Sequence, residues 1–438
     1  MAPLKAWGNP SRIVTSDTVV TDPPLAIYHD VLPAEGAVCA RLTHAKHGDL
    51  RGITHAEPGD DDRIVWTMHM GHDRLPRLEE LLPRWGGCLS ISLWLCAADD
   101  WDHIKAWHSA TSERRDSITF HAVLGTGAYP YNVMRNVALS PFAPWAAGKN
   151  MPHPWVLVAD ADGVPSTGEK SFGEVLQAAV KGRGNLYPQT LATIPSLLQK
   201  QLTKLGLNAP PLRDATKPSP TPAPASLCDT WDGHPEPMQC NQNGRPSGLG
   251  WARRDSTQNW ARAHSRCEKA VSETETFFVI PSFDTHGRND EILESLREIP
   301  GSEPAATSFA FLRALFGSNA VEIQAQEGYP PSYEAMVPWP IWNSDEPAGA
   351  FPVHYSFIYE PYFIAKAPFP STSLDNWAPF DEFFREPGYD KCTFFVETAG
   401  VPRGRVGHMD LLVLPHVYLL NVNGGSGPRP SRHMNWER

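Results

Sequence analysis

The sequence predicts an α/β fold with parallel strands, and two observations lead to this class. Residues 64–96 contain two apolar runs typical of buried strands, separated by a stretch with helical spacing. A strand, a helix and a strand in this order form a βαβ unit, which implies a parallel sheet with a right-handed crossover. Further along, the apolar run Trp155–Val158 stops at two acids, and Gly163 and Pro165 prevent its simple continuation.

Composition narrows the class of protein. The 438 residues are 41% hydrophobic and carry a formal net charge of −11, so the chain is globular and acidic. Nucleic acid as a partner is disfavoured because its phosphates require clustered Lys and Arg. An anionic substrate would need a local positive charge to bind it, such as a metal ion or a single arginine. No apolar run reaches the roughly 18 residues that a membrane span requires, so no span is predicted. The sequence leaves the oligomeric state open.

The first half of the chain predicts alternating strands and helices. Residues 1–62, rich in Pro, Gly and Asp, predict an irregular extension with one or two short strands. After it come strands at 64–68, 88–96, 117–124 and 155–158, and helices at 74–85, 101–113 and 132–139. We interpret this half as a doubly wound layer of the kind that binds nucleotides.

The second half is interrupted by a change in composition. Helical spacing at 170–205 gives way to a Pro-rich stretch, which predicts an exposed, disordered insertion at about 206–250. Order resumes with a strand at 277–281, helices at 290–298 and 307–316, an aromatic-rich region at 329–384 that fits a core or a sugar-stacking cleft, and a last strand at 411–420. One domain, 63–424, and a mobile tail, 425–438, complete the prediction.

The seven cysteines give little evidence of a metal site. They are scattered without a C-x-x-C spacing, so no zinc site is recognisable. Cys88 and Cys96 lie in an apolar run and predict buried thiols. Cys228 and Cys240 flank a loop-like stretch and could pair in an oxidising compartment.

Asp160 and Asp162 are the strongest candidate metal ligands. If the backbone stays extended, the two side chains lie on one side of the chain, at the carboxyl end of a strand where α/β sheets bind ligands. Carboxylate oxygens suit Mg²⁺ or Mn²⁺, which could bridge to a nucleotide diphosphate. An ordinary polar turn after a strand is the alternative interpretation of an isolated Asp-x-Asp.

Several segments, in order, resemble one family: the glucuronyltransferase-like glycosyltransferases of the LARGE and β-1,4-glucuronyltransferase type, glycosyltransferase family 49. The matching segments are TMHMGHDRLPRLEELLPRWGGCLSISLWL (67–95), ITFHAVLGTGAYPYNVMRNVAL (118–139), PWVLVADADGVPS (154–166), FFVIPSFD (277–284), YEPYFIAK (359–366), PFDEFFREPGYDK (379–391) and LPHVYLL (414–420). No single segment is diagnostic, but the ordered set is specific.

The resemblance implies a GT-A fold with a mixed central sheet and helices on both sides, a UDP-sugar donor and a glycan acceptor. It also implies a divalent cation, Mn²⁺ or Mg²⁺, held by Asp160 and Asp162. The transferred sugar would be glucuronic acid or xylose. Around the donor the resemblance places the side chains of Thr67, His69, Arg74, Arg135, Asn136 and Asp160. Ordinary structural roles are the alternatives for His69, in the core or at the surface, and for Arg135, in a surface ion pair.

Inversion at the anomeric carbon needs a base that takes the proton of the acceptor hydroxyl. The segment at 379–391 makes Asp390 the first candidate, followed by Asp381 and Glu382. The structural alternatives are a helix cap for the latter two and a surface pair with Lys391 for Asp390.

One position departs from the family pattern. Where the family has a histidine after the last strand, as a third protein ligand of the metal, this chain has Asn421. An amide oxygen can bind Mg²⁺ or Mn²⁺ but is weaker than imidazole for Mn²⁺. The sequence therefore leaves two functions open: a metal-dependent glycosyltransferase, or a catalytically impaired glycan- or nucleotide-binding protein on the same fold. The family works in the Golgi lumen, but the chain shows no signal segment, anchor or glycosylation sequon, so the compartment also stays open.

Overall fold

The computed structural model describes the following parts of the chain: residues 12–14, 25–44, 63–96, 100–126, 129–142, 154–166, 171–180, 196–207, 276–285, 289–298, 305–318, 321–323, 351–353, 361–367, 380, 382, 394, 410–414 and 417–421. Most of the predicted insertion at 206–250, the whole tail at 425–438, and Cys228 and Cys240 lie outside these residues. Within them, no helix combines the length and the apolar composition that crossing a membrane requires.

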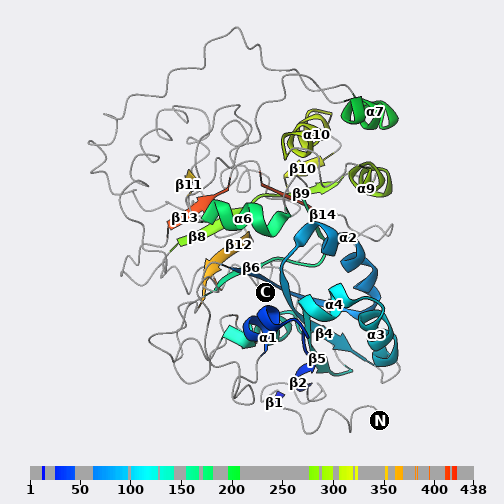
Figure 1. Ribbon diagram of the computed structural model, residues 1–438. Coiled ribbons are helices and arrows are strands. Elements are labelled where there is room, and N and C mark those ends of the chain that lie inside the picture. Colours follow the sequence, from blue (N-terminus) through cyan, green and yellow to red (C-terminus); the bar gives the residue numbers. More distant parts are fainter. Residues whose placement is uncertain are drawn as a thin grey trace, which may run out of the picture.

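A mixed sheet of ten strands forms the centre of the described structure (Figure 1). From one edge to the other its strands are β1 (Arg12–Val14), β2 (Leu25–Leu32), β5 (Ile118–Leu124), β4 (Cys88–Leu95), β3 (Ile64–Gly71), β6 (Trp155–Val158), β12 (Tyr362–Lys366), β8 (Thr276–Ile280), β13 (Asp410–Val413) and β11 (Phe351–Val353). Strands β5, β4, β3 and β6 are parallel, which confirms the predicted βαβ arrangement, whereas β12 is antiparallel to both of its neighbours.

A second sheet of four short strands continues from the first. Its strands, in spatial order, are β10 (Val321–Ile323), β9 (Ser282–Thr285), β14 (Leu419–Asn421) and β7 (Gly163–Pro165). Strands β6, β8 and β13 of the large sheet are followed along the chain by β7, β9 and β14 of the small one. All three run in the same direction, so their carboxyl ends lie at the junction between the two sheets.

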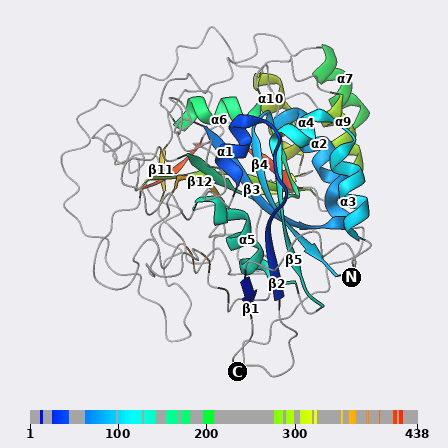
Figure 2. The same ribbon diagram turned by 60° about the horizontal axis from the view of Figure 1, so that its bottom comes forward.

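Helices cover both faces of the large sheet (Figure 2). Alternate residues of β3 point to opposite faces, as a strand requires. Trp66 and Met68 pack with α2 (Leu75–Trp85), α3 (Asp100–Ser109) and α6 (Phe172–Val180). On the other face Val65 packs with α1 (Ala37–Thr43) and with residues that follow β5, including α5 (Tyr131–Leu139). The remaining helical segments are η4 (His72–Arg74), α4 (Ser112–Ser117), η5 (Ser140–Phe142), α7 (Ser196–Lys204), α9 (Asn289–Arg297) and α10 (Ala305–Gly317).

Two buried serines of β4 fix α5 against the sheet. Ser90 Oγ donates to the carbonyl of Ala138 at 2.6 Å, and Ser92 Oγ donates to the carbonyl of Met134 at 2.7 Å. Both hydroxyls are fully buried, at positions where an apolar residue is usual. The two hydrogen bonds supply the partners that buried hydroxyls need. The serines therefore set the position of α5, and α5 carries Arg135 and Asn136.

Three predictions about the elements need correction. Within the segment 1–62, residues 25–44 are more regular than expected: besides a predicted strand they form the helix α1, and β2 pairs with β5 inside the large sheet. The single helix at 101–113 is two, α3 and α4, because Thr111 accepts a hydrogen bond from the backbone of Arg114 and starts a new helix. The last strand is also two, β13 and β14, because the chain passes from one sheet to the other.

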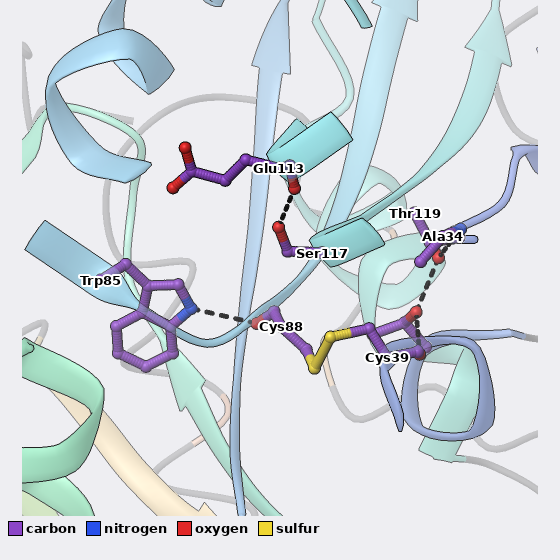
Figure 3. The surroundings of a disulfide bond; sticks show 8 residues. Ala34, Cys39, Trp85, Cys88, Glu113, Ser117 and Thr119 are labelled. Carbon is purple, nitrogen blue, oxygen red and sulfur yellow. Dashed lines mark hydrogen bonds between the residues drawn. A yellow bond between two sulfur atoms is a disulfide. The ribbon is translucent and has the colours of Figure 1, made fainter. Parts of the chain in front are cut away.

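The prediction of a buried thiol at Cys88 is wrong. Cys88, the first residue of β4, forms a disulfide with Cys39 of α1 (Figure 3). The contact of α1 with β4 brings the two residues together across 49 positions of sequence, a proximity that spacing alone does not indicate. Cys96 is a free cysteine, as expected, but it is exposed because it follows the end of β4.

Candidate active site

The two acids of the Asp-x-Asp pair lie in a turn, so the extended backbone that would place both side chains on one side is not present here. Strand β6 ends at Val158, and the backbone N–H of Gly163 donates to the carbonyl of Asp160 at 3.2 Å before β7 begins. The turn is required because the chain changes sheets here. The side chain of Asp160 is 28% exposed and that of Asp162 is 20% exposed, so both are accessible from solvent.

Three different elements place polar side chains against Asp160, and two of these side chains, Arg135 and Tyr362, donate hydrogen bonds to it. Arg135 of α5 donates from Nη2 to Oδ1 over 3.4 Å, and His69 Nε2 of β3 lies 3.4 Å from the same oxygen. Tyr362 of β12 donates its hydroxyl to Oδ2 at 3.2 Å. Burial, together with nearby negative charge, raises the pKa of Tyr362 well above its usual value, so this hydroxyl stays protonated and donates. His69 and Arg135 thus both contact Asp160, and their place beside a donor stays a prediction.

Arg74 forms an ion pair with Asp162, with 2.5 Å between Nη1 and Oδ2. Burial is the largest influence on the carboxyl group and raises the pKa of Asp162. The charge of Arg74 opposes this rise, and the charge of Asp160 adds to it. The turn therefore contains two carboxylates close enough to influence each other, each of them next to an arginine.

Thr67 and Asn136 hold neighbouring segments of the chain together through their hydrogen bonds. Thr67 donates from Oγ1 to the carbonyl of Leu157 at 3.1 Å, which joins β3 to β6 just before the turn. The amide of Asn136 donates to the carbonyl of Phe380 at 2.8 Å and to Oε1 of Glu382 at 3.1 Å. Phe380 and Glu382, two residues of the segment predicted to face the acceptor, thus contact the same helix that carries Arg135. Asp381 and Asp390 lie outside the described residues.

Asn421 reaches the site through the small sheet. In β14 it lies opposite Gly163 of β7, the residue after Asp162, and opposite Asp284 of β9. Its Nδ2 donates to Oδ1 of Asp284 at 2.8 Å. Its own Oδ1 is buried and has no hydrogen-bond partner among the described residues. The predicted third metal position is therefore beside the aspartate turn, but its amide is already engaged on one side.

Three residues of the site were not predicted from the sequence. Tyr362 was considered only for the core or for stacking on a sugar; its ring is buried and its hydroxyl contacts Asp160. The Tyr129 hydroxyl lies 2.9 Å from Nδ1 of His69, and burial strongly raises the pKa of this tyrosine. Asp284 ends a quoted segment, FFVIPSFD, yet only the strand register shows that it faces Asn421. The position of Asp284 shortly after a buried strand is the one feature of the sequence that could have indicated a place in the site.

Known proteins show partial similarity to this chain. The chain is 31% identical over 129 residues to the xylosyl- and glucuronyltransferase LARGE2s of Danio rerio, a match that covers 29% of this chain and 16% of the relative. It is 29% identical over 127 residues to the xylosyl- and glucuronyltransferase LARGE1 of Homo sapiens, covering 28% of this chain and 16% of the relative. No family model matches the chain.

The chain is related to glycosyltransferases. The similar region spans about a sixth of the length of these two relatives, 16% in each. The mixed α/β architecture with its central mixed sheet is compatible with a GT-A fold. The similarity therefore supports the class of enzyme, and the donor, the acceptor and the metal are matters of proposal.

The donor groups of the turn fit a hard divalent cation. Among the described residues, no three side chains of His, Cys, Asp or Glu lie together in a way that could hold a metal. Asp160, Asp162 and Asn421 differ from such a group because the third ligand would be an amide oxygen. Carboxylate and amide oxygens suit Mg²⁺ or Mn²⁺. The buried, unpartnered Oδ1 of Asn421 is the observation that favours this set.

Proposed function

We propose that the chain is a metal-dependent glycosyltransferase with a GT-A fold. It moves a sugar, glucuronic acid or xylose, from a UDP-sugar to a hydroxyl of a glycan acceptor, and it inverts the anomeric carbon. The observation that carries this proposal is the meeting of Asp160, Asp162, Arg74, Arg135 and Asn421 at the junction of the two sheets. Arg74, Arg135, Asp160 and Asp162 come from segments that resemble the family in order, Asn421 directly follows another such segment, and the relatives named above are transferases.

Charge balance explains why such a site would need a cation. The formal charges of Asp160 and Asp162 are matched by those of Arg74 and Arg135. A donor diphosphate adds negative charge that this set does not neutralise. A divalent cation on Asp160, Asp162 and Asn421 would supply the missing positive charge and stabilise the leaving diphosphate. The two arginines would orient the phosphate oxygens, for which the planar guanidinium group is well suited.

The acceptor side would be built on the segment held by Asn136. Glu382 is half-buried and accepts a hydrogen bond from Asn136, so it lies against the helix that carries Arg135. A carboxylate in this segment would take the proton of the acceptor hydroxyl. Asp390 is the first candidate, and Glu382 and Asp381 follow. Turnover of an Asp390→Asn variant within a few fold of the wild type would remove Asp390 from the mechanism.

The proposed function also places the protein in the secretory pathway, such as the Golgi lumen. The disulfide between Cys39 and Cys88 supports it, because such bonds form and persist in oxidising compartments.

Calorimetry with UDP, with and without Mn²⁺, tests the proposed function. We expect binding of UDP that depends on the metal and is lost in Asp160→Asn and Asp162→Asn, while UDP-glucuronic acid or UDP-xylose is slowly hydrolysed. Asp102→Asn, an exposed change on α3, is the matched control. If UDP binds in neither condition, the proposal fails.

The second candidate function is a binding protein without turnover, and Asn421 is the observation that favours it. An amide there is a weaker ligand for Mn²⁺ than imidazole. Metal-dependent UDP binding without any hydrolysis or transfer would support this candidate. Activity gained in Asn421→His would instead identify a functional site with a relaxed metal position.

A further inference from the structure

Asp284 and Asn421 form a pair at the edge of the aspartate turn. The parallel register of β14 and β9 places the two residues opposite each other, and the antiparallel register of β14 and β7 places Asn421 opposite Gly163. Asn421 is 4% exposed. The asparagine is therefore enclosed between an acid on one strand and the end of the turn on the other.

The charge of Asp284 decides which way the amide of Asn421 points. Nδ2 donates to Oδ1 of Asp284 at 2.8 Å. If the amide were turned over, its oxygen would face the carboxylate, and two acceptors would oppose each other without a proton between them. The amide oxygen is therefore directed away from Asp284. It is buried there without a hydrogen-bond partner among the described residues, an arrangement that costs about 1–3 kcal/mol unless another group satisfies it.

The carboxylates of Asp160, Asp162 and Asp284 share one neighbour, the buried hydroxyl of Tyr362. The hydroxyl of Tyr362 donates to Asp160 at 3.2 Å. The charges of Asp160, Asp162 and Asp284 all act on this buried hydroxyl and, after burial itself, raise the pKa of Tyr362. The strand registers place Asn421 between Asp284 and Gly163, at the end of the aspartate turn, and its hydrogen bond to Asp284 orients its amide.

We propose that Asp284 is a positioning residue that holds the amide oxygen of Asn421 toward a divalent cation on Asp160 and Asp162, and that this all-oxygen set discriminates less between Mn²⁺ and Mg²⁺ than an imidazole at position 421 would. The inference rests on the proposed function, since it assumes that the turn binds a metal. Imidazole suits transition metals, whereas carbonyl and carboxylate oxygens suit Mg²⁺ and Mn²⁺. Groups that orient a metal ligand typically contribute about 10–100-fold to metal affinity.

Metal binding without nucleotide tests the inference on the full chain. Electron paramagnetic resonance of free Mn²⁺ gives the Mn²⁺ affinity, and competition gives the Mg²⁺ affinity. We expect Asp284→Asn, which removes the charge but keeps the shape, to weaken Mn²⁺ binding about tenfold or more. We expect Asn421→His to strengthen Mn²⁺ binding at least about tenfold more than Mg²⁺ binding, and Asp284→Asn in that background to remove most of the gain.

Controls separate positioning from folding and from the proposed function. Asp102→Asn should leave both affinities unchanged, and thermal melting checks that each variant is folded. Should Asp284→Asn be unfolded, the Mn²⁺ to Mg²⁺ affinity ratio of Asn421→His still decides the matter. A folded Asp284→Asn with Mn²⁺ affinity within about twofold of the wild type would overturn the inference, as would an unchanged Mn²⁺ to Mg²⁺ ratio in Asn421→His. If the metal pattern holds but UDP does not bind, only the proposed function fails.

Discussion

Asn136 and Phe380, 244 positions apart in the sequence, form a reciprocal pair of hydrogen bonds. The Nδ2 group of Asn136 donates to the carbonyl of Phe380 at 2.8 Å, and the backbone N–H of Phe380 donates to Oδ1 of Asn136 at 3.0 Å. Both residues are buried. One side chain therefore attaches the segment at 380–382 to the helix that carries Arg135.

Removal of this attachment should destabilise the protein and impair use of the acceptor. In Asn136→Ala the backbone groups of Phe380 lose their partners, which costs about 1–3 kcal/mol in the free energy of unfolding. Urea unfolding measures this loss, and the KM for the acceptor should rise more than the KM for the donor. Gln199→Ala, exposed on α7, is the control. Equal unfolding free energies for Asn136→Ala and the wild type would contradict the prediction.

Arg135 should contribute to binding of the donor. Its guanidinium is held by Oδ1 of Asn132 at 3.1 Å and lies 5.6 Å from the ring centre of Phe380, so it is oriented before any ligand arrives. Loss of a charged hydrogen bond typically costs about 1.5–3 kcal/mol, so Arg135→Gln should weaken UDP binding by about tenfold or more. Arg115→Gln, which affects a surface pair with Glu35, should bind UDP normally. Calorimetry decides, and normal UDP affinity in Arg135→Gln would exclude the role.

His108 should make the fold sensitive to acid. It is buried on α3, and its Nε2 has no hydrogen-bond partner among the described residues. Burial is the main influence and lowers the pKa of His108 below the ordinary value of about 6.5. Because the folded pKa is lower than the unfolded one, the stabilising contribution is present above about pH 6.5 and is lost as the pH falls through the folded pKa.

A phenylalanine at position 108 should therefore reduce the loss of stability in acid. Urea unfolding at about pH 7.5 and about pH 5, on either side of the ordinary histidine pKa, measures the difference. His103→Phe, an exposed change on the same helix, should lose as much stability as the wild type. The prediction is wrong if His108→Phe and the wild type lose the same unfolding free energy between the two pH values.

The disulfide should stabilise the fold as a whole. Cys39 and Cys88 close a loop across 49 positions of sequence, and a bond of this kind typically contributes about 2–4 kcal/mol. Cys39→Ser should lower the unfolding free energy by that amount, and dithiothreitol should have the same effect on the wild type. Cys96→Ser changes the exposed free cysteine and should have no effect. Insensitivity of the wild type to the reductant would contradict the prediction.

The strands of the first half could be predicted from sequence because their signals are local. The segments of β3, β4, β5 and β6 are rich in apolar residues and almost entirely buried, as expected for parallel strands covered on both faces, and the leucines of α2 recur with helical spacing. The aspartate turn was found for the same reason, since two acids directly follow an apolar run.

The rest of the site depends on contacts between distant segments. The pairing of Asn421 with Asp284 requires the register of β14 on β9, and single strands of three or four residues carry no information about register. The contact of Tyr362 with Asp160 requires β12 to lie beside β6 in antiparallel orientation. The Cys39–Cys88 bond likewise depends on the packing of α1 over β4. None of these relationships has a signature within a short stretch of sequence.

The passage of three strands between the two sheets has a consequence for cooperativity. Strands of three or four residues are too short to form an independently stable sheet in water. The small sheet is therefore ordered by its covalent continuity with β6, β8 and β13 of the large one. We expect backbone amides on both sides of the junction to exchange hydrogen for deuterium in a single opening event, with the aspartate turn inside that unit.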